Sequence, residues 1–161
     1  MTNTPGKKRT DKATRIIQAT PQQIYKALVD PAALAVWLPP KGMKGEMLEF
    51  DARVGGFYRM ALTYLEMDAS TQGKTTENTD VVEGKFLEFS PDQHVVQLVQ
   101  FESDDPAYAG EMTMTWALAA VPEGTAVTIL CENVPEGIRK EDHDKGLRSS
   151  LENLADYIGS V

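Results

Sequence analysis

The sequence predicts an α+β fold: a first strand, two short helices, six further strands of an antiparallel sheet and a long C-terminal helix. Three observations lead to this prediction. Apolar and polar residues alternate through 112–118 and 127–131, which is typical of strands with one buried face. Leucines recur on one helical stripe between 147 and 158. Between these parts, short apolar runs are separated by residues that favour turns.

The N-terminal region begins with a polar stretch and continues into a first strand. Residues 1–11 are polar and include Pro5 and Gly6, so we expect a flexible tail there and a single domain over 12–161. The β-branched pair in residues 15–19 then predicts the first strand.

Two short helices are predicted next. Thr20 is a suitable N-cap, with Pro21 at the first helical position and Gln23 at the capping-box position. Asp30-Pro31 ends this helix, because the residue before a proline disfavours helical geometry. A second helix over 31–38 is stopped by a proline pair.

Six strands are predicted in the middle of the chain. The first two are joined by a turn at Gly55-Gly56, and the polar stretch Ser70–Thr79 is expected to be a long exposed loop. The expected strands cover residues 46–51, 57–66, 80–89, 94–102, 111–120 and 125–133.

The last element is predicted to be one helix over residues 139–158. Glu141 and Asp142 near its start complement the positive end of the helix dipole. Gly159 follows the last apolar position and is the expected C-terminal cap.

Composition limits the classes of function. The 161 residues carry a formal net charge of −8, which argues against binding to nucleic acid or anionic membranes. Cys131 is the single cysteine, so an intrachain disulfide and a thiolate metal cluster are excluded. We see neither a signal peptide nor an apolar stretch long enough to span a membrane, and we expect a cytoplasmic protein.

Several motifs resemble those of one family. Residues 31–40 form a short helix that ends in Trp and Pro, and Asp51 to Met60 follows an acidic-x-Arg-x-Gly-Gly-aromatic pattern. Residues 82–91 and 124–129 resemble the central strand with its proline turn and the final hairpin. Together they resemble the START-like (SRPBCC) superfamily, in the branch of homologues of the activator of the heat-shock protein 90 ATPase. Gly146-Leu147 departs from the Gly-Trp with which that family usually opens its last helix.

The resemblance implies a helix-grip fold, in which a curved antiparallel sheet of about seven strands wraps around the long C-terminal helix and leaves a cavity between them. A small apolar or amphipathic molecule would bind in this cavity, which we expect to measure a few hundred Å³. Methionine and tryptophan suit such a pocket, although the same side chains could simply fill the core. The candidate ligand-binding residues are Trp37, Tyr58, Met60, Leu62, Met112, Met114, Trp116, Ile129 and Leu147.

Other chemistry-bearing residues favour a structural interpretation. His143 lies among acidic residues without a second histidine at ligand spacing, so a solvated helix end is favoured over a metal or acid–base site. Arg53 and Arg59 could meet a carboxylate at the pocket rim, but Arg59 is expected in an outward salt bridge. Cys131 is expected to be an inert core thiol. We assign no catalytic residue, no metal and no cofactor.

Three functions remain open from the sequence. The favoured one is a binding module for a small molecule. The second is a module that stimulates a chaperone ATPase through surface contact, and it is less favoured because the activators proper carry a further N-terminal domain. The third is an enzyme that uses the cavity, with Tyr58, Tyr64 and His143 as the candidates for proton transfer. The oligomeric state, monomer or homodimer, is left open.

Overall fold

The computed structural model describes residues 9–39, 42–65, 79–103, 105–108 and 110–160. The expected tail residues 1–8 and most of the expected loop Ser70–Thr79 lie outside these ranges. The strands are β1 Arg9–Ile17, β2 Met43–Phe50, β3 Phe57–Tyr64, β4 Thr79–Ser90, β5 His94–Phe101, β6 Met112–Val121 and β7 Gly124–Val134. The helices are α1 Pro21–Leu28, α2 Pro31–Trp37 and α3 Lys140–Ser160, with a 3-10 turn at Pro106–Tyr108.

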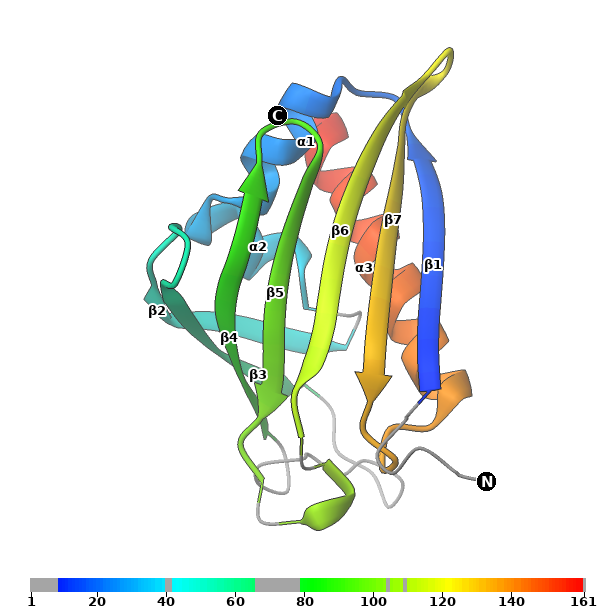
Figure 1. The fold of residues 1–161 in the computed structure, drawn as a ribbon. Helices are drawn as coiled ribbons and strands as arrows, with labels where there is room; N and C mark the ends of the chain where they lie inside the picture. Colours follow the sequence, from blue (N-terminus) through cyan, green and yellow to red (C-terminus); the bar gives the residue numbers. More distant parts are fainter. Residues whose placement is uncertain (1–8, 40–41, 66–78, 104, 109, 161) are drawn as a thin grey trace, which may run out of the picture.

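The predicted fold class is confirmed. All seven strands form one antiparallel sheet in the order β1-β7-β6-β5-β4-β3-β2. Figure 1 shows α3 lying behind the strands β6, β7 and β1, while α1 and α2 lie beside the upper part of α3. In the same view β2 runs across the direction of β5–β7, so the sheet curves around the helices.

Irregular pairing at three places contributes to this curvature. The register shifts between Arg9 and Asp11, between Met47 and Glu49, and between Phe86 and Glu88. A bulge bends its strand and increases the local twist, so these shifts help the sheet to close around a helix.

The short helices begin as the sequence predicts. The Thr20 side chain accepts a hydrogen bond from the backbone N–H of Gln23, and the Gln23 side chain accepts one from the N–H of Thr20, which completes the capping box. At the end of α2, Trp37 is almost fully buried and donates its indole N–H to the carbonyl of Ala27, 3.1 Å away. This bond joins the two helices.

Two predicted boundaries are wrong. β1 begins at Arg9, so Arg9 to Asp11 belong to the sheet and not to the tail, because Asp11 is buried against β7 and α3. The helix α3 continues through Gly159 to Ser160, so Gly159 is not a cap.

Candidate functional site

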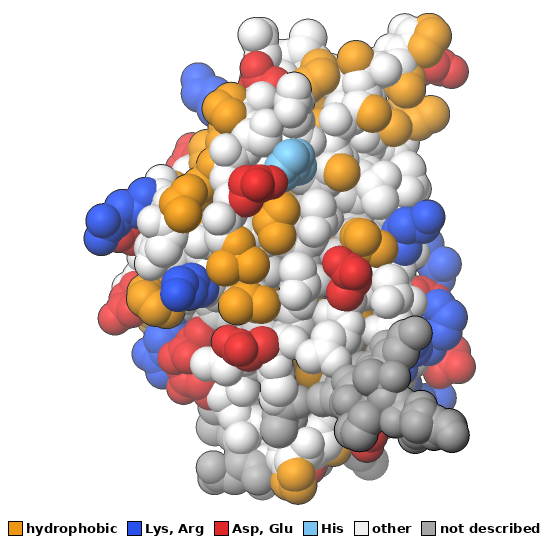
Figure 2. Space-filling view, in the orientation of Figure 1, with side chains coloured by type: hydrophobic (Ala, Val, Ile, Leu, Met, Phe, Trp, Pro, Cys, Tyr) orange, Lys and Arg blue, Asp and Glu red, His pale blue; other side chains and the backbone are white. Residues whose placement is uncertain are grey.

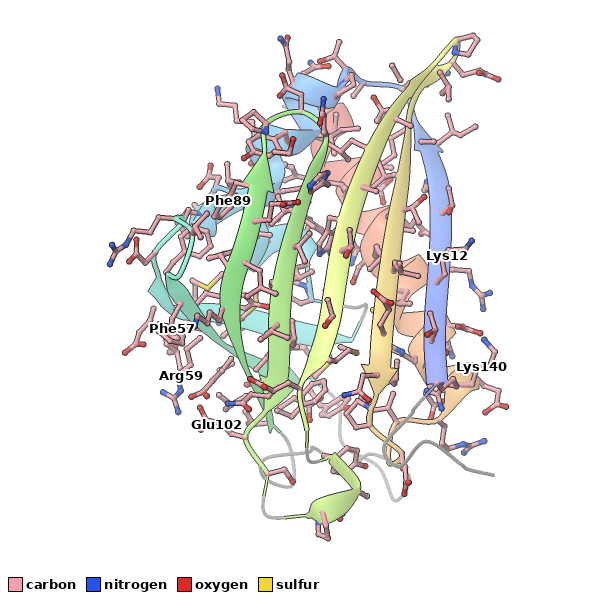
Figure 3. The ribbon with its side chains drawn as sticks, in the orientation of Figure 1. Lys12, Phe57, Arg59, Phe89, Glu102 and Lys140 are labelled. Atoms are coloured by element: carbon pink, nitrogen blue, oxygen red, sulfur yellow. The ribbon has the colours of Figure 1, made fainter. Side chains whose placement is uncertain are left out.

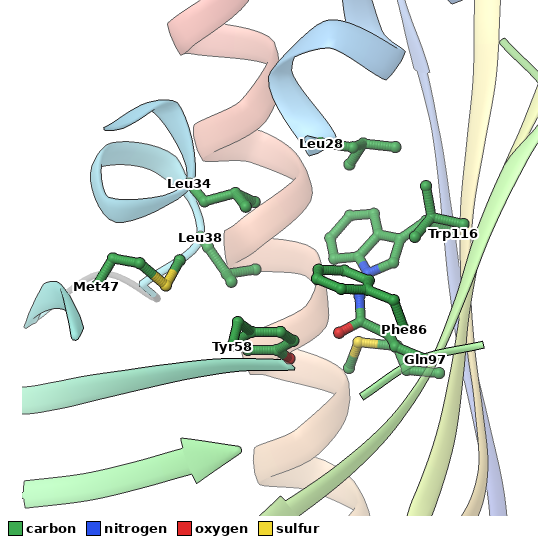
Figure 4. Close-up of a pocket in the computed structure, with 10 residues that line it drawn as sticks. Leu28, Leu34, Leu38, Met47, Tyr58, Phe86, Gln97 and Trp116 are labelled. Carbon is green, nitrogen blue, oxygen red and sulfur yellow. The ribbon is translucent and has the colours of Figure 1, made fainter. Parts of the chain in front are cut away.

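A small cavity lies between the sheet and the helices. In Figure 4, Leu34, Leu38 and Met47 stand on one side, and Phe86, Gln97 and Trp116 stand on the other. The centres of water molecules could occupy about 30 Å³ of this space. The ten lining residues come from α1, α2 and the residue after it, and from β2, β3, β4, β5 and β6: Leu28, Leu34, Leu38, Met47, Tyr58, Phe86, Val95, Gln97, Met114 and Trp116.

The size of the cavity corrects our expectation of a few hundred Å³. A water molecule needs roughly 10–15 Å³ measured in this way, so the cavity has room for only about two waters. The reason is close packing around it: Trp37 and Trp116 meet edge to face with ring centroids 5.3 Å apart. The large side chains occupy much of the space that the sequence assigned to a ligand.

The structure brings together three of the nine candidate ligand-binding residues. Tyr58, Met114 and Trp116 line the cavity. The other six pack into or against the adjoining hydrophobic core and are not among the lining residues: Trp37, Met60, Leu62, Met112, Ile129 and Leu147.

Gln97 is the lining residue of most chemical interest, and the sequence analysis missed it. Its side chain lies on the inward face of β5 between Val95 and Val99, and the residue is 8% exposed. Its amide oxygen Oε1 is buried, and none of the described residues hydrogen-bonds to it. The available signal was a single polar residue in an alternating apolar row, Val95-x-Gln97-x-Val99.

Tyr58 forms the cavity wall on β3, and Gly84 on the neighbouring strand makes room for it. The two residues pair directly across β3 and β4, and a Cβ on Gly84 would lie 2.0 Å from Cε1 of Tyr58. The Tyr58 ring also packs against Phe86, with centroids 5.5 Å apart. Burial raises the pKa of Tyr58, and the nearby Cys131 adds to this, so the phenol is neutral at physiological pH.

The three candidates for proton transfer are not assembled into one site. Tyr58 lines the cavity, whereas Tyr64 and His143 do not. Cys131 is fully buried, and burial raises its pKa to about 12, so its thiol stays protonated as the sequence predicts.

His143 corrects a second expectation, because it is not part of a solvated helix end. Its Nδ1 lies 2.6 Å from Oδ2 of Asp11, and its side chain is only 13% exposed. The Asp11 carboxylate is fully buried and accepts two further hydrogen bonds from Arg9. Lys140 Nζ lies 3.8 Å from Oδ1 of Asp11. Figure 3 shows Lys140 at the start of α3, beside the start of β1. This ionic cluster ties the first strand to the last helix.

The outward arginine is confirmed. Arg59 donates to Glu102, with Nη2 and Oε1 2.9 Å apart, and its Nε lies 3.6 Å from Glu83 (Figure 3). Arg53 pairs with Asp51 at 2.6 Å in an exposed position. Neither arginine lines the cavity.

The described residues contain neither a metal-binding cluster nor a helix suited to crossing a membrane. Within these residues, no group of three or more His, Cys, Asp or Glu is placed to hold a metal ion. None of the helices in the described ranges combines the length and the apolar character needed to cross a bilayer.

Comparison with known proteins places the chain among START-like proteins. A crystal structure of a protein from Chromobacterium violaceum is 34% identical, with a TM-score of 0.80 over 92% of this chain and 96% of that chain. An NMR structure of an AHSA1-like protein from Aeromonas hydrophila is 16% identical, with a TM-score of 0.70 over 94% and 93% of the two chains, and supports the fold alone.

The family assignment comes from a sequence model. No curated protein matches the chain significantly. The family model described as "Activator of Hsp90 ATPase homolog 1-like protein" matches residues 18–159, which is most of the chain. The chain therefore belongs to the AHSA1-like family of the START-like (SRPBCC) superfamily.

Proposed function

We propose that the protein is a binding module for a small, uncharged and mainly apolar molecule, held in the cavity between the sheet and the α1–α2 segment. The observation that supports this most is the cavity itself, whose lining is apolar except for a few polar groups. Small-molecule sites generally have this composition, with isolated polar groups that orient the ligand.

The charge of the lining restricts the ligand. None of the ten lining residues is acidic, basic or a histidine. Burying an ion without a partner costs on the order of several kcal/mol, even after the protein relaxes around it. The cavity therefore favours neutral ligands over carboxylates and ammonium ions.

A ligand larger than about two waters must displace part of the wall. We assign this movement to the side formed by Leu38 and Met47, because both side chains are only half-buried. Met47 lies on β2, one of the two edge strands, which among the described strands pairs with β3 alone. Leu38 follows α2, and its carbonyl accepts a hydrogen bond from Ser150 on α3 at 2.8 Å. Rotation of these two side chains would enlarge the cavity without unpairing the central strands.

The family description suggests a chaperone ATPase as an alternative partner. This alternative rests on that description, whereas the binding module also has support from the cavity. An enzymatic role would need a base beside the cavity, and Tyr64 and His143 do not line it.

The test uses methyl NMR of methionine-labelled protein. Met47 and Met114 line the cavity, whereas Met60 and Met112 are buried beside it and serve as internal controls. Titration with p-xylene, p-cresol and indole should shift the Met47 and Met114 methyl signals saturably, and shift the control signals less.

A titration without any change at the cavity would contradict the proposal. If all three compounds leave the Met47 and Met114 signals unchanged up to their solubility limits, or move only exposed methyl groups, the binding proposal is wrong.

A further inference from the structure

Gln97 occupies the centre of a row of cavity-lining residues. It pairs with Phe86 across β4 and β5 and with Met114 across β5 and β6, and all three side chains line the cavity. Figure 4 shows the Gln97 amide in the space between Tyr58 and Trp116. The amide is therefore directed into the site and away from the surface of the sheet.

In the part of the chain that the structure describes, this amide oxygen has no hydrogen-bond partner. Oε1 is buried and unpaired, and its neighbours on the same face of β5 are Val95 and Val99. A buried acceptor without a hydrogen bond is destabilising relative to an apolar side chain of similar shape. A molecule that enters the cavity can remove this penalty by donating a hydrogen bond.

We propose that Gln97 determines specificity by accepting a hydrogen bond from an O–H or N–H group of the ligand. This inference rests on the proposed binding function and narrows its ligand class. The preferred ligand is a neutral amphipathic molecule, with an apolar body against Leu34 and Phe86 and one donor group at Gln97 Oε1.

Two other classes of ligand are disfavoured. A hydrocarbon of equal shape leaves Oε1 unpaired, and a site with a buried polar group rejects ligands that cannot pair with it. A carboxylate would place a negative charge in a lining without a cation.

The experiment compares two ligands of nearly equal shape in three proteins. p-Cresol carries a hydroxyl where p-xylene carries a methyl group, and both dissociation constants are measured by methionine methyl NMR. The test variant is Gln97→Met, which keeps the side-chain length and removes the amide. The control is Gln100→Met on the same strand, where the exposed glutamine amide donates to Glu83 at 3.2 Å.

We expect Gln97→Met to change the ratio of the two dissociation constants by about tenfold in favour of p-xylene. Gln100→Met should leave the ratio as in the wild type. Without ligand, Gln97→Met should melt at the same temperature or higher, because an unpaired buried acceptor has been removed.

Three results would overturn the inference in distinguishable ways. An unchanged ratio in Gln97→Met, with binding of both compounds intact, removes the specificity role and leaves the binding function. A melting temperature clearly below that of the wild type shows that the amide has a structural partner in the free protein. If the wild type binds neither compound, the proposed function fails and the inference fails with it.

Discussion

At the scale of single residues, Gly84 shows how the sequence makes space for a cavity wall. Its missing side chain lets the Tyr58 ring lie flat against β4, where any Cβ would collide with the ring. A glycine inside a strand usually weakens it, so its value here is the close approach of another side chain.

Substitution of Gly84 by alanine should lower the free energy of unfolding by about 1–3 kcal/mol, because the Tyr58 ring must move out of a packed site. The measurement is urea unfolding. Gly146→Ala is the matched control: this glycine lies inside α3 with open space around its Cβ position, so alanine should stabilise the protein by about 0.5–1 kcal/mol. Equal effects of the two substitutions would contradict this account of Gly84.

Gln97 shows the limit of pattern reading at the residue scale. A polar residue at an inward strand position was visible in the sequence, but alternation alone does not tell whether its amide is paired. That depends on which side chains stand opposite, here Phe86 and Met114, and hence on the register of three strands.

At the scale of elements, most of the architecture could be predicted. Caps, prolines and alternation are local signals, and they located α1, α2 and the strands β2 to β7 to within a few residues. β1 was placed six residues late, because its first residues are polar and Asp11 is buried only through a partner 132 positions away. The residues near Asp11 in the sequence therefore do not indicate that it is buried.

The α2–β2 wall is the element whose displacement the binding proposal requires. Leu38→Ala removes part of that wall, so less rearrangement is needed before a ligand enters. We expect p-xylene to bind about tenfold more tightly, because the binding-competent fraction of the protein rises. The free energy of unfolding should fall by about 1–2 kcal/mol, since Leu38 is half-buried.

The control for this variant is Leu87→Ala. Leu87 is the extra residue of the β4 bulge and is 38% exposed, outside the cavity lining. Figure 2 shows apolar side chains among charged ones on the face of the sheet opposite α3. If Leu87→Ala strengthens p-xylene binding as much as Leu38→Ala does, the ligand does not enter through the proposed wall.

At the scale of the whole molecule, the ionic cluster of Asp11 with Arg9 and His143 joins the first strand to the last helix. Burial acts to raise the pKa of Asp11, but the hydrogen bonds from Arg9 and His143 outweigh it and hold the pKa below its usual value. A carboxyl with a lowered pKa stabilises the fold at neutral pH, and this contribution is lost as the pH falls below about 4 through the folded-state pKa.

Asp11→Asn should therefore lower the free energy of unfolding at pH 7 by about 2–4 kcal/mol, because it removes the buried carboxylate to which Arg9 and His143 are hydrogen-bonded. The difference from the wild type should shrink as the pH is lowered from 5 towards 2, as measured by urea unfolding. Asp51→Asn, in the exposed pair with Arg53, should have little effect at any pH. A constant difference between Asp11→Asn and the wild type across this range would show that the carboxylate charge does not matter.

The volume of the cavity could not be predicted from the sequence, because it depends on side-chain packing across the whole molecule. The nine inward-facing candidates could fill the core or line a pocket, and the outcome depends on how side chains from several elements interdigitate. Close packing of these side chains leaves about 30 Å³ in this cavity. The sequence predicted which residues face inward. Whether such a residue lines the cavity or fills the core depends on the positions of the side chains around it.

The most direct test is a crystal structure of the protein soaked with p-cresol. The account predicts one molecule between Tyr58 and Trp116, with its hydroxyl within about 2.7–3.2 Å of Gln97 Oε1 and with Leu38 and Met47 displaced outward. An unchanged cavity that holds only water, with p-cresol absent or bound on the outer face of the sheet, would contradict it.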